Sequence, residues 1–413
     1  MEWVAVVGVD WGDKEHAYTI RGADGTRICG KISSGSEEVH GWVRGLRELY
    51  PEGTVVIAVE QGRGSLIYAL AQYEFVSLVP INPRASKAYR DSLRLSGASD
   101  DASDAERICE FALKHLPDLR VWQPDDVATR KVRMLSEHRR ALVDQRTAAT
   151  HTIAATLKMF FPQAIEWFGG ETSLLLRVFL MRWPTLADLR QATIEQLMEV
   201  FRSRRCRKIS ARAKALYDQL RLAVPITLDA PIISAGSMYV GAQIALADAL
   251  DQQIAQYDRA IAQAWSEHPD RQIFEALPGA GPVLAPRLGA ALGTDRDRYQ
   301  DASQIQCYSG IAPVIEQSGK TRWVHARWGY PTFLHQTFFE FAQASIPHSP
   351  WAKAVYLEQR HLGADHHEAI RALAFRWIRI IFAIWKKRTL YNEQKHIDRL
   401  RKTASPIAAR LAA

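Results

Sequence analysis

The stretch Val4-Ala5-Val6-Val7-Gly8-Val9-Asp10 is a β-branched apolar run that ends on a single carboxylate. A short run of this composition predicts a buried strand. A second run, Thr54-Val55-Val56-Ile57-Ala58-Val59, ends in the same way on Glu60. Two adjacent strands that each end on an acid can place both carboxylates on one divalent cation, because Mg²⁺ prefers oxygen ligands and takes few of them from the protein. The sequence therefore predicts an acidic metal site at one edge of a sheet.

The elements around these two runs follow a mixed α/β order. Apolar alternation and turn residues predict strands over residues 4–10, 16–20, 27–32, 54–59 and 75–79, with helices over 37–50 and 65–73. Ser36 can cap the first helix. Three antiparallel strands, a helix, then strand, helix and strand is the element order of an RNase H-like fold, an analogy at the level of fold alone.

Two further acids begin the next predicted helix. Asp101 and Asp104 are three residues apart, so they share one face of a helix that continues over residues 107–115. An acidic first turn is also ordinary helix capping, and this segment alone favours that interpretation. A strand-end Asp10, a strand-end Glu60 and this Asp-x-x-Asp pair, in that order, favour a cage of four carboxylates for two Mg²⁺ ions.

The composition limits the class of protein. A chain of 413 residues predicts two or three domains. Its 53 Lys and Arg exceed its 45 Asp and Glu, and this net charge of +8 favours a polyanionic partner. Cys29, Cys109, Cys206 and Cys307 are too far apart for a zinc knuckle or a redox pair and suit a reducing cytosol. No signal peptide opens the chain, and the apolar segment 378–385 is too short to span a bilayer, so we expect a soluble cytoplasmic protein without membrane partners.

Long charged helices are expected between residues 124 and 270. Residues 127–161 contain no Pro or Gly and predict one long helix or a bent pair. Further on, steps of four and three predict a coiled-coil seam made of Val240, Ile244, Ala247, Leu250, Ile254, Tyr257, Ile261 and Ala264. Such a seam implies dimerisation, whereas an amphipathic helix packed inside its own domain explains the pattern equally well.

Two segments are predicted to contact nucleic-acid phosphates. The first is a dense run of cations, Arg202, Arg204, Arg205, Arg207 and Lys208. Most charge runs are solvated surface, but in a basic protein a run this dense favours contact with phosphate. In the second segment, Gly279 and Gly281 bracket a turn between two helical stretches, as in a helix-hairpin-helix whose backbone N–H groups hold a phosphate. Such a turn also occurs as a plain helix connection.

A serine in a polar loop, Ser318, is followed by Gly319 and by the cations Lys320, Arg322 and Arg327. A free serine hydroxyl is a poor nucleophile, but neighbouring cations can favour its alkoxide and stabilise charge on a phosphate under attack. A Ser-Gly pair is most often only a turn, so these residues by themselves favour a turn over a catalytic serine.

Together these segments resemble the DEDD transposases of insertion-sequence family 110. The motifs that carry the resemblance are GVDWGDKEH with Asp10, AVEQGRGS with Glu60, SDDASDAE with Asp101 and Asp104, then LPGAGPVLA, YSGIAP and QSGK with Ser318. The resemblance covers residues 1–120 and 270–390. It implies that the four acids bind Mg²⁺ in a RuvC-like domain and that the serine forms a covalent phosphoserine link with DNA.

The resemblance also implies partners. Donor and target DNA would be chosen by a structured guide RNA encoded at the element's own end, while the protein reads nucleic-acid shape. Recombining two duplexes takes several active sites, so we expect a homodimer that assembles to a tetramer. Two departures from the family's pattern leave alternatives. Asp100 can replace Asp101 as the third ligand, and Arg327 is our choice over Lys320 and Arg322 for the residue that steadies the phosphate.

These inferences predict four regions and one activity. The regions are a RuvC-like metal-binding domain over 1–120, a helical and coiled-coil region for RNA or DNA binding and dimerisation over 121–270, a mainly helical transposase domain with the serine over 271–395, and a basic tail over 396–413. The expected activity is RNA-guided DNA recombination. One rival is a metal-dependent RuvC-like nuclease in which water attacks and Ser318 is a turn residue. Another is a non-catalytic nucleic-acid scaffold with Asp101 and Asp104 as helix caps. A tyrosine recombinase built on Tyr308 ranks lower, because it lacks an Arg-His-Arg set.

Overall fold

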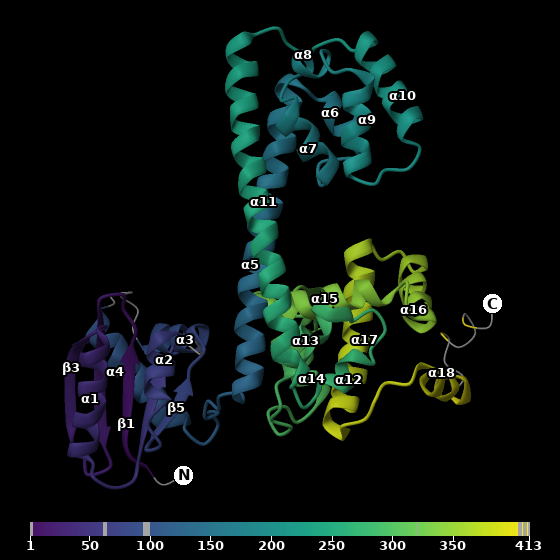
Figure 1. Ribbon diagram of the computed structural model, residues 1–413. Helices are drawn as coiled ribbons and strands as arrows, with labels where there is room; N and C mark the ends of the chain where they lie inside the picture. The colour runs from purple at the N-terminus through teal and green to yellow at the C-terminus, as the bar shows by residue number, and fades with distance from the viewer. Residues whose placement is uncertain are drawn as a thin grey trace. The chain divides into compact units, whose positions relative to one another are not determined.

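The computed structural model describes residues 3–60, 64–93, 100–319 and 321–403, together with 407 and 411. The chain divides into two compact units, Met1–Pro124 and Asp125–Ala413 (Figure 1). Each unit has its own hydrophobic core. The subdivision of the second unit at residue 270 stays a prediction.

A mixed five-stranded sheet forms the centre of the first unit. Its strands are β1 (Trp3–Asp10), β2 (Glu15–Gly22), β3 (Arg27–Ser33), β4 (Thr54–Val59) and β5 (Val76–Pro80). The spatial order is β3-β2-β1-β4-β5, with β1 to β3 antiparallel and the β1–β4 and β4–β5 pairs parallel. This topology confirms the predicted meander and the RNase H-like fold, and it places β1 in the middle of the sheet.

Helices cover both faces of this sheet. They are α1 (Ser36–Leu49), α2 (Ser65–Leu70), α3 (Pro83–Leu93) and α4 (Asp101–His115). Val7 on β1 belongs to the core under α1 and α2, whereas Val6 belongs to the core under α4, so the strand is buried on both faces. That burial explains its unbroken apolar run. The predicted cap of α1 was wrong by one position, because Gly35 is the N-cap and makes no side-chain cap bond.

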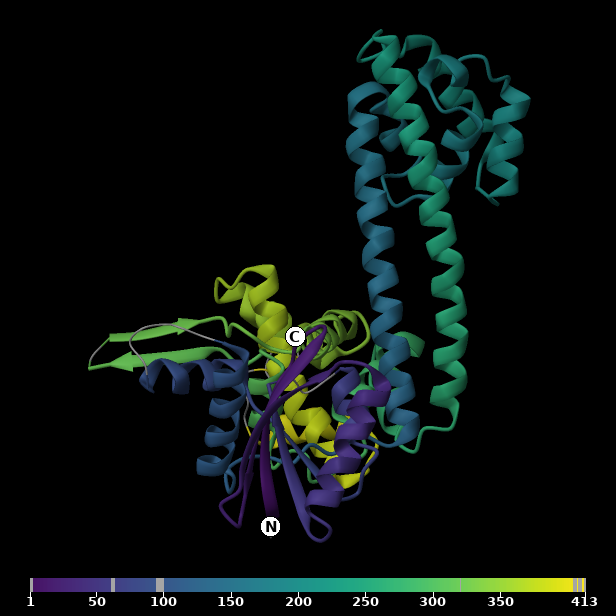
Figure 2. The ribbon, with the colours of Figure 1, turned by 90° about the vertical axis from the view of Figure 1, so that its left-hand side faces the viewer.

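Two long helices, α5 (Val127–Phe160) and α11 (Ala230–Ser266), lie side by side in the second unit (Figures 1 and 2). The single helix α5 confirms the prediction for residues 127–161. Of the predicted seam on α11, six residues are buried, namely Val240, Ile244, Ala247, Leu250, Ile254 and Ile261. Because they pack within the chain, the dimer inferred from this seam is not supported, and packing inside its own domain is what the structure shows.

Helix α11 is the one helix among the described residues that is long and apolar enough to cross a membrane, with 17% of its most apolar window buried. Acids along it are engaged by arginines of the same unit. Asp258 pairs with Arg139 of α5, and Asp248 pairs at 2.7 Å with Arg177. These ion pairs are evidence for a helix packed within protein, because charges in lipid are costly.

Shorter helices are inserted between α5 and α11. They are α6 (Gln163–Trp167), α7 (Leu174–Arg182), α8 (Leu186–Leu189), α9 (Ile194–Ser203) and α10 (Ile209–Leu222). Their core contains a chain of aromatic rings, with Phe179 4.1 Å from Phe168, 5.2 Å from Phe201 and 5.6 Å from Trp183 between ring centroids. Val240 and Ile244 of α11 share this core, which fixes the inserted helices to the end of the long pair.

The rest of the second unit is mainly helical, as predicted. Its elements are α12 (Arg271–Glu275), α13 (Gly281–Leu292), α14 (Ala302–Tyr308), β6 (Val314–Ser318), β7 (Thr321–His325), α15 (Thr332–Ser345), α16 (Pro350–His361), α17 (His366–Lys387) and α18 (Glu393–Lys402). The core centres on Trp377 and Trp385 of α17, which are fully buried. The predicted basic tail begins inside α18, and residues 404–406, 408–410 and 412–413 lie outside the described part of the chain.

Candidate functional site

Two predicted acids end neighbouring parallel strands. Val9 of β1 pairs with Val59 of β4 in the parallel register, and the next residues are Asp10 and Glu60. Both acidic residues are partly buried. Because the register matches the two strand ends, both carboxylates lie at the same edge of the sheet, as the sequence predicts.

Helix α4 brings the other two predicted acids to the same edge. A Cβ atom on Gly8 would lie 2.2 Å from the carbonyl oxygen of Ala105, so the helix packs directly on the backbone of β1. Further from the strand end, the Cys109 thiol donates to the carbonyl of Val6 at 3.3 Å. The helix therefore runs opposite to β1, and its first turn, with Asp101 and Asp104, approaches the end that carries Asp10.

The charges of the other three acids act on the Asp10 carboxylate. The pKa of Asp10 is raised from 3.8 to about 6. Burial is the main cause, and repulsion from the carboxylates of Asp104, Glu60 and Asp101 adds to it. Attraction to Arg90 opposes the shift. A cluster of like charges at a partly buried strand end is typical of a functional site.

Arginines that the sequence reasoning missed hold one of these acids. The Asp104 carboxylate accepts from Arg107 Nη1 at 2.7 Å and from Arg90 Nη1 at 3.3 Å. Its side chain is 21% exposed, whereas that of Asp101 is 72% exposed and lies 3.8 Å from Lys31 Nζ. The i,i+3 spacing on one helix could have indicated Arg107. Arg90 comes from α3, a helix that the pattern did not predict.

Asp100 is the helix cap of α4. Its side chain accepts from the backbone N–H of Ser103 at 2.8 Å, and Ser103 completes a capping box. The rival interpretation took Asp101 and Asp104 as the helix caps, and it is wrong, because the N-cap is Asp100 and those two acids lie in the first turn. Because a carboxylate oxygen of Asp100 is used by the cap, Asp101 is the better candidate for the third metal ligand.

The donor set suits a hard divalent cation, since it consists of carboxylates alone. A divalent cation bound there would offset the repulsion that the other three acids exert on Asp10. In the described ranges, no three His, Cys, Asp or Glu side chains stand close enough together to form a metal site as they are. Asp104 is instead held by its two arginines.

Ser318 is the last residue of β6, in a two-stranded hairpin with β7, and not in the polar loop that we predicted. It pairs with Thr321, and Gly319 between them has φ +59°. Ser318 and Arg322 are exposed, while Lys320 lies outside the described residues. Arg327 follows the hairpin and is partly buried, and its Nε has no hydrogen-bond partner in the described part of the chain. A hydroxyl at the end of a hairpin is open to a large substrate.

The dense run of cations covers the last turn of α9 and the exposed turn that leads to α10. Arg202, Arg204, Arg205, Arg207 and Lys208 are all exposed. Arg205 and Lys208 adopt left-handed backbone conformations, with φ of 50° and 54°. Non-glycine residues rarely do so, because the conformation is strained. The turn thus directs cations outward at some cost in stability.

The predicted Gly-bracketed turn separates α12 from α13. A Cβ on Gly279 would lie 2.4 Å from the carbonyl oxygen of Ala344 in α15, so this glycine is required by packing. Gly281, in contrast, is exposed, and a Cβ there would have no neighbour within 4 Å in the described part of the chain. Since α12 has five residues, the turn serves first as a helix connection.

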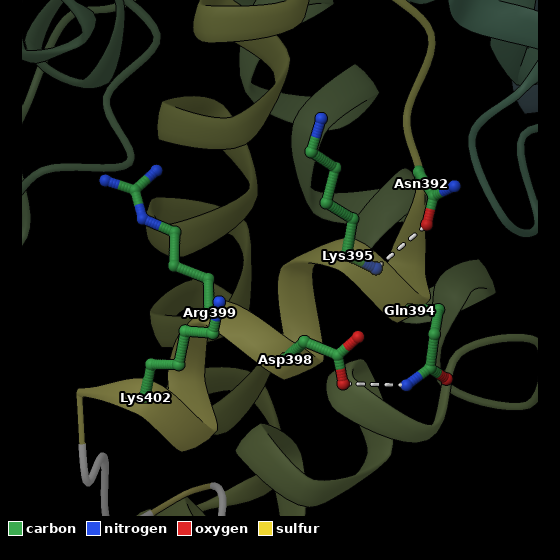
Figure 3. Close-up of a pocket in the computed structure, with 6 residues that line it drawn as sticks. All are labelled: Asn392, Gln394, Lys395, Asp398, Arg399 and Lys402. Atoms are coloured by element: carbon green, nitrogen blue, oxygen red, sulfur yellow. Dashed lines mark hydrogen bonds between the residues drawn. The ribbon is translucent and has the colours of Figure 1, made fainter.

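A hollow of about 550 Å³ lies along α18 (Figure 3). It is lined by Asn392, Gln394, Lys395, Asp398, Arg399 and Lys402. Three of these six residues are cations on one helix, and none is a predicted catalytic residue. The hollow is therefore a basic surface feature distinct from the acids and from Ser318.

Comparison with known proteins gives matches at both ends of the chain. A DEDD transposase model of the IS110 type matches residues 7–162, and a model described as "Transposase IS116/IS110/IS902 family" matches residues 271–357. The "Mini-circle putative transposase for IS117" of Streptomyces coelicolor is 27% identical over 94% of this chain and 95% of its own length. The "Insertion element IS900 uncharacterized 42 kDa protein" of Mycobacterium paratuberculosis is 26% identical over 93% and 96%. The matched segments contain the four acids and Ser318.

Proposed function

Because this chain belongs to the IS116/IS110/IS902 family of transposases, which cut and transfer DNA, we propose that it rejoins DNA through a covalent phosphoserine intermediate on Ser318. The observation that supports the proposal is that Asp10 and Glu60 end two paired parallel strands and the first turn of α4 lies beside them, in a chain that also exposes a serine at the end of a hairpin.

In the proposed reaction, the Ser318 hydroxyl oxygen attacks the phosphorus of the scissile phosphate. The Ser O–P bond forms as the bond from phosphorus to the leaving deoxyribose oxygen breaks, the serine proton is lost and the leaving oxygen takes up a proton. Rejoining is the reverse reaction with the hydroxyl of another strand. The ester conserves the bond energy, so no ATP is needed.

The chain's own residues serve this reaction in two ways. Arg327 steadies the charge that develops on the phosphate oxygens, while Lys320 and Arg322 contact the nucleic acid. Asp10, Glu60, Asp101 and Asp104 would hold Mg²⁺, as two ions in our proposal, and the DEDD family implies a divalent metal. When bound, such a cation polarises a phosphate oxygen or lowers the pKa of a hydroxyl.

A structured guide RNA is the second nucleic-acid partner in this proposal. The exposed turn with Arg202, Arg204, Arg205, Arg207 and Lys208 supports it, because an outward cluster of cations binds phosphate without reading sequence. The backbone of Gly281 is exposed and can contact a phosphate in the same way. The close packing of Gly279 against Ala344 holds this turn in place. Base pairing by the RNA would supply the choice of target.

A homodimer that assembles to a tetramer is part of the proposal, with a surface other than the predicted seam. A second stripe on α11 follows steps of three and four and is exposed throughout, namely Ile232, Ala235, Tyr239, Ala242, Leu246 and Ala249. This stripe carries no charge, and exposed apolar stripes at heptad spacing favour association of helices. It suits a second copy of the chain.

The test of this proposal measures the formation of DNA that is covalently linked to the protein. The purified protein is incubated with Mg²⁺, its co-purified RNA and labelled DNA that carries the element's junction, then denatured. We expect an adduct that Ser318→Ala abolishes and that Thr321→Ala, which changes the hydroxyl directly opposite across the hairpin, preserves. Asp10→Asn should abolish cleavage and adduct together. Cleavage without adduct in the unmodified protein would favour the RuvC-like nuclease, and unchanged activity in Asp10→Asn would favour the non-catalytic scaffold.

A further inference from the structure

The β6–β7 hairpin exposes an aromatic side chain that its own unit does not cover. Trp323 is 66% exposed on β7, and Val324 beside it is 59% exposed. Figure 2 shows the hairpin as two light green arrows that extend away from the helices of its own unit. A two-stranded hairpin is marginal by itself in water, and a large exposed ring adds nothing to its stability. The ring therefore fits contact with a ligand.

The register of the hairpin places this ring on the same face as the candidate nucleophile. Ser318 pairs with Thr321, and Glu316 pairs with Trp323. Paired residues and residues two apart share a face of a β-ladder, so Trp323 is the diagonal neighbour of Ser318. Diagonal neighbours are about 7 to 8 Å apart, within reach of a large aromatic side chain. One nucleotide can bridge such a span between its phosphate and its base.

The other groups on the hairpin suit a nucleic-acid strand better than a protein surface. Among the described residues of the hairpin, the register places Ser318, Thr321, Glu316 and His325 on the face of the Trp323 ring, and the partly buried Val314 is the one aliphatic side chain there. This face therefore lacks the extended apolar patch that protein interfaces use. Glu316 accepts from His325 Nε2 at 3.0 Å, which raises the pKa of that imidazole and offsets the acid's charge. Arg322 is exposed on the opposite face.

We infer that Trp323 stacks on an unpaired DNA base beside the phosphate that Ser318 attacks, so that the hairpin is a binding site for single-stranded DNA. Stacking on an exposed aromatic ring is how proteins hold single strands without reading sequence, because every base has a π face. The location of the base relative to the scissile phosphate rests on the proposed function. The stacking itself does not.

The test compares full-length variants in a Ser318→Ala background, where no covalent chemistry interferes. Anisotropy of labelled oligothymidylate, at fixed salt, gives the affinity for single-stranded DNA. We expect Trp323→Ala to weaken binding roughly tenfold and Trp323→Phe to retain most of it, since phenylalanine keeps a π face. Val324→Ala is the matched control, because it removes a neighbouring exposed side chain on the opposite face, and it should have little effect.

A second arm identifies the stacked base. An oligothymidylate with one abasic site should bind the Ser318→Ala protein more weakly than the intact strand, and Trp323→Ala should lose this difference. The inference is overturned if Trp323→Ala binds as well as the parent, if Val324→Ala loses as much, or if Trp323 matters only for oligouridylate RNA. A change in sedimentation of Trp323→Ala without DNA would assign the ring to a protein contact instead.

The outcome separates this inference from the proposed function. If the protein with Ser318 forms no adduct but Trp323→Ala still loses affinity, the phosphoserine mechanism fails and the stacking stands. If the adduct forms at the parent rate in a Trp323→Ala protein with Ser318 intact and binding is unchanged, the stacking fails and the recombinase mechanism stands.

Discussion

A Cβ atom on Gly8 would lie 2.2 Å from the carbonyl oxygen of Ala105, which shows that helix α4 rests directly on the backbone of the central strand. The same close approach places the first turn of α4 beside the end of β1. It therefore joins Asp101 and Asp104 to Asp10, and the candidate metal site depends on a glycine that carries no functional group of its own.

Gly8→Ala should damage the metal site and the fold together. The added methyl group meets backbone and not a flexible side chain, so α4 must shift, and overpacking of this kind costs about 1 to 3 kcal/mol. We expect a lower midpoint in urea and weaker stabilisation by Mn²⁺ or Mg²⁺ than in the parent protein. Unfolding curves with and without the metal measure both effects.

Gly41→Ala is the matched control for that substitution. Gly41 lies inside helix α1, and a Cβ there would meet none of the described residues within 4 Å. Alanine favours the helix by about 1 kcal/mol relative to glycine, so stability should rise and the response to metal should not change. A Gly8→Ala protein as stable and as metal-responsive as the parent would contradict the proposed role of the close approach.

Replacing the two left-handed residues of the basic turn should raise the stability of the protein and weaken its binding of nucleic acid. Arg205→Gly with Lys208→Gly removes two exposed cations and relieves two left-handed backbone positions, which cost about 1 kcal/mol or more each for residues with a Cβ. We expect a higher melting temperature but weaker binding of RNA or DNA. On duplex DNA, the slope of log K against log salt should become shallower by about 0.9 for each phosphate that the variant no longer neutralises.

Arg221→Ala provides the control for the turn. Arg221 is an exposed cation in the last turn of α10, away from residues 202–208. It should change neither the salt slope nor the melting temperature by much. Equal losses of affinity in the turn and control variants would mean that net charge alone, and not the turn, attracts nucleic acid.

The second stripe of α11 should control assembly. Tyr239→Glu with Leu246→Glu places two charges on exposed apolar positions, so the fold is retained while association of two copies is opposed. Light scattering after gel filtration should give a smaller particle than the parent protein. Leu362→Glu, at an exposed position after α16, should leave the mass unchanged. If the parent, the double variant and the Leu362→Glu protein all had the same mass, the stripe would have no part in assembly.

Acidification should destabilise the second unit through His268. Burial lowers the pKa of this imidazole below 6.5, against the attraction of Asp270 and Asp126. Its Nδ1 accepts from the Asp270 N–H at 3.2 Å, and Nε2 lies 2.8 Å from Thr129 Oγ1, so the neutral ring is the one that fits. The unfolded chain takes up the proton first, hence stability is unaffected above about pH 7 and falls as the pH drops through 6.5.

Melting temperatures at pH 7.5 and 5.5 measure this dependence. His268→Gln removes the titrating ring and should flatten the change between the two values, although the variant is less stable at both. His361→Gln, at an exposed position, should keep the parent's pH dependence. An equally steep loss in His268→Gln would show that other groups cause the acid sensitivity.

Local composition was enough for the central strands and the long helix. The runs ending on Asp10 and Glu60 are buried on both sides and therefore unbroken in the sequence, and α5 has no Gly or Pro to interrupt it. The hairpin around Ser318 was missed because its strands are short and exposed. The Gly319-Lys320 pair between two alternating runs was the signal that could have found it.

Two other differences have a physical reason. A heptad pattern has the same spacing whether its partner is the same chain or another, so the seam at Val240 and Ile244 could not reveal that it is covered within its own unit. Likewise, several acids stand at the start of α4, so the sequence alone does not tell which of them is the N-cap. The choice of Asp100 depends on which side chain reaches the Ser103 N–H.

Residue types and their spacing along the chain were sufficient for the order of strands, the acids at their ends, the apolar stripes and the motifs of the transposase family, because all of these are local properties. The folded arrangement was needed to establish which stripe of α11 is covered, which arginines hold Asp104, and which residues share a face with Ser318. Those relationships depend on packing and strand register, which exist only when the chain has folded.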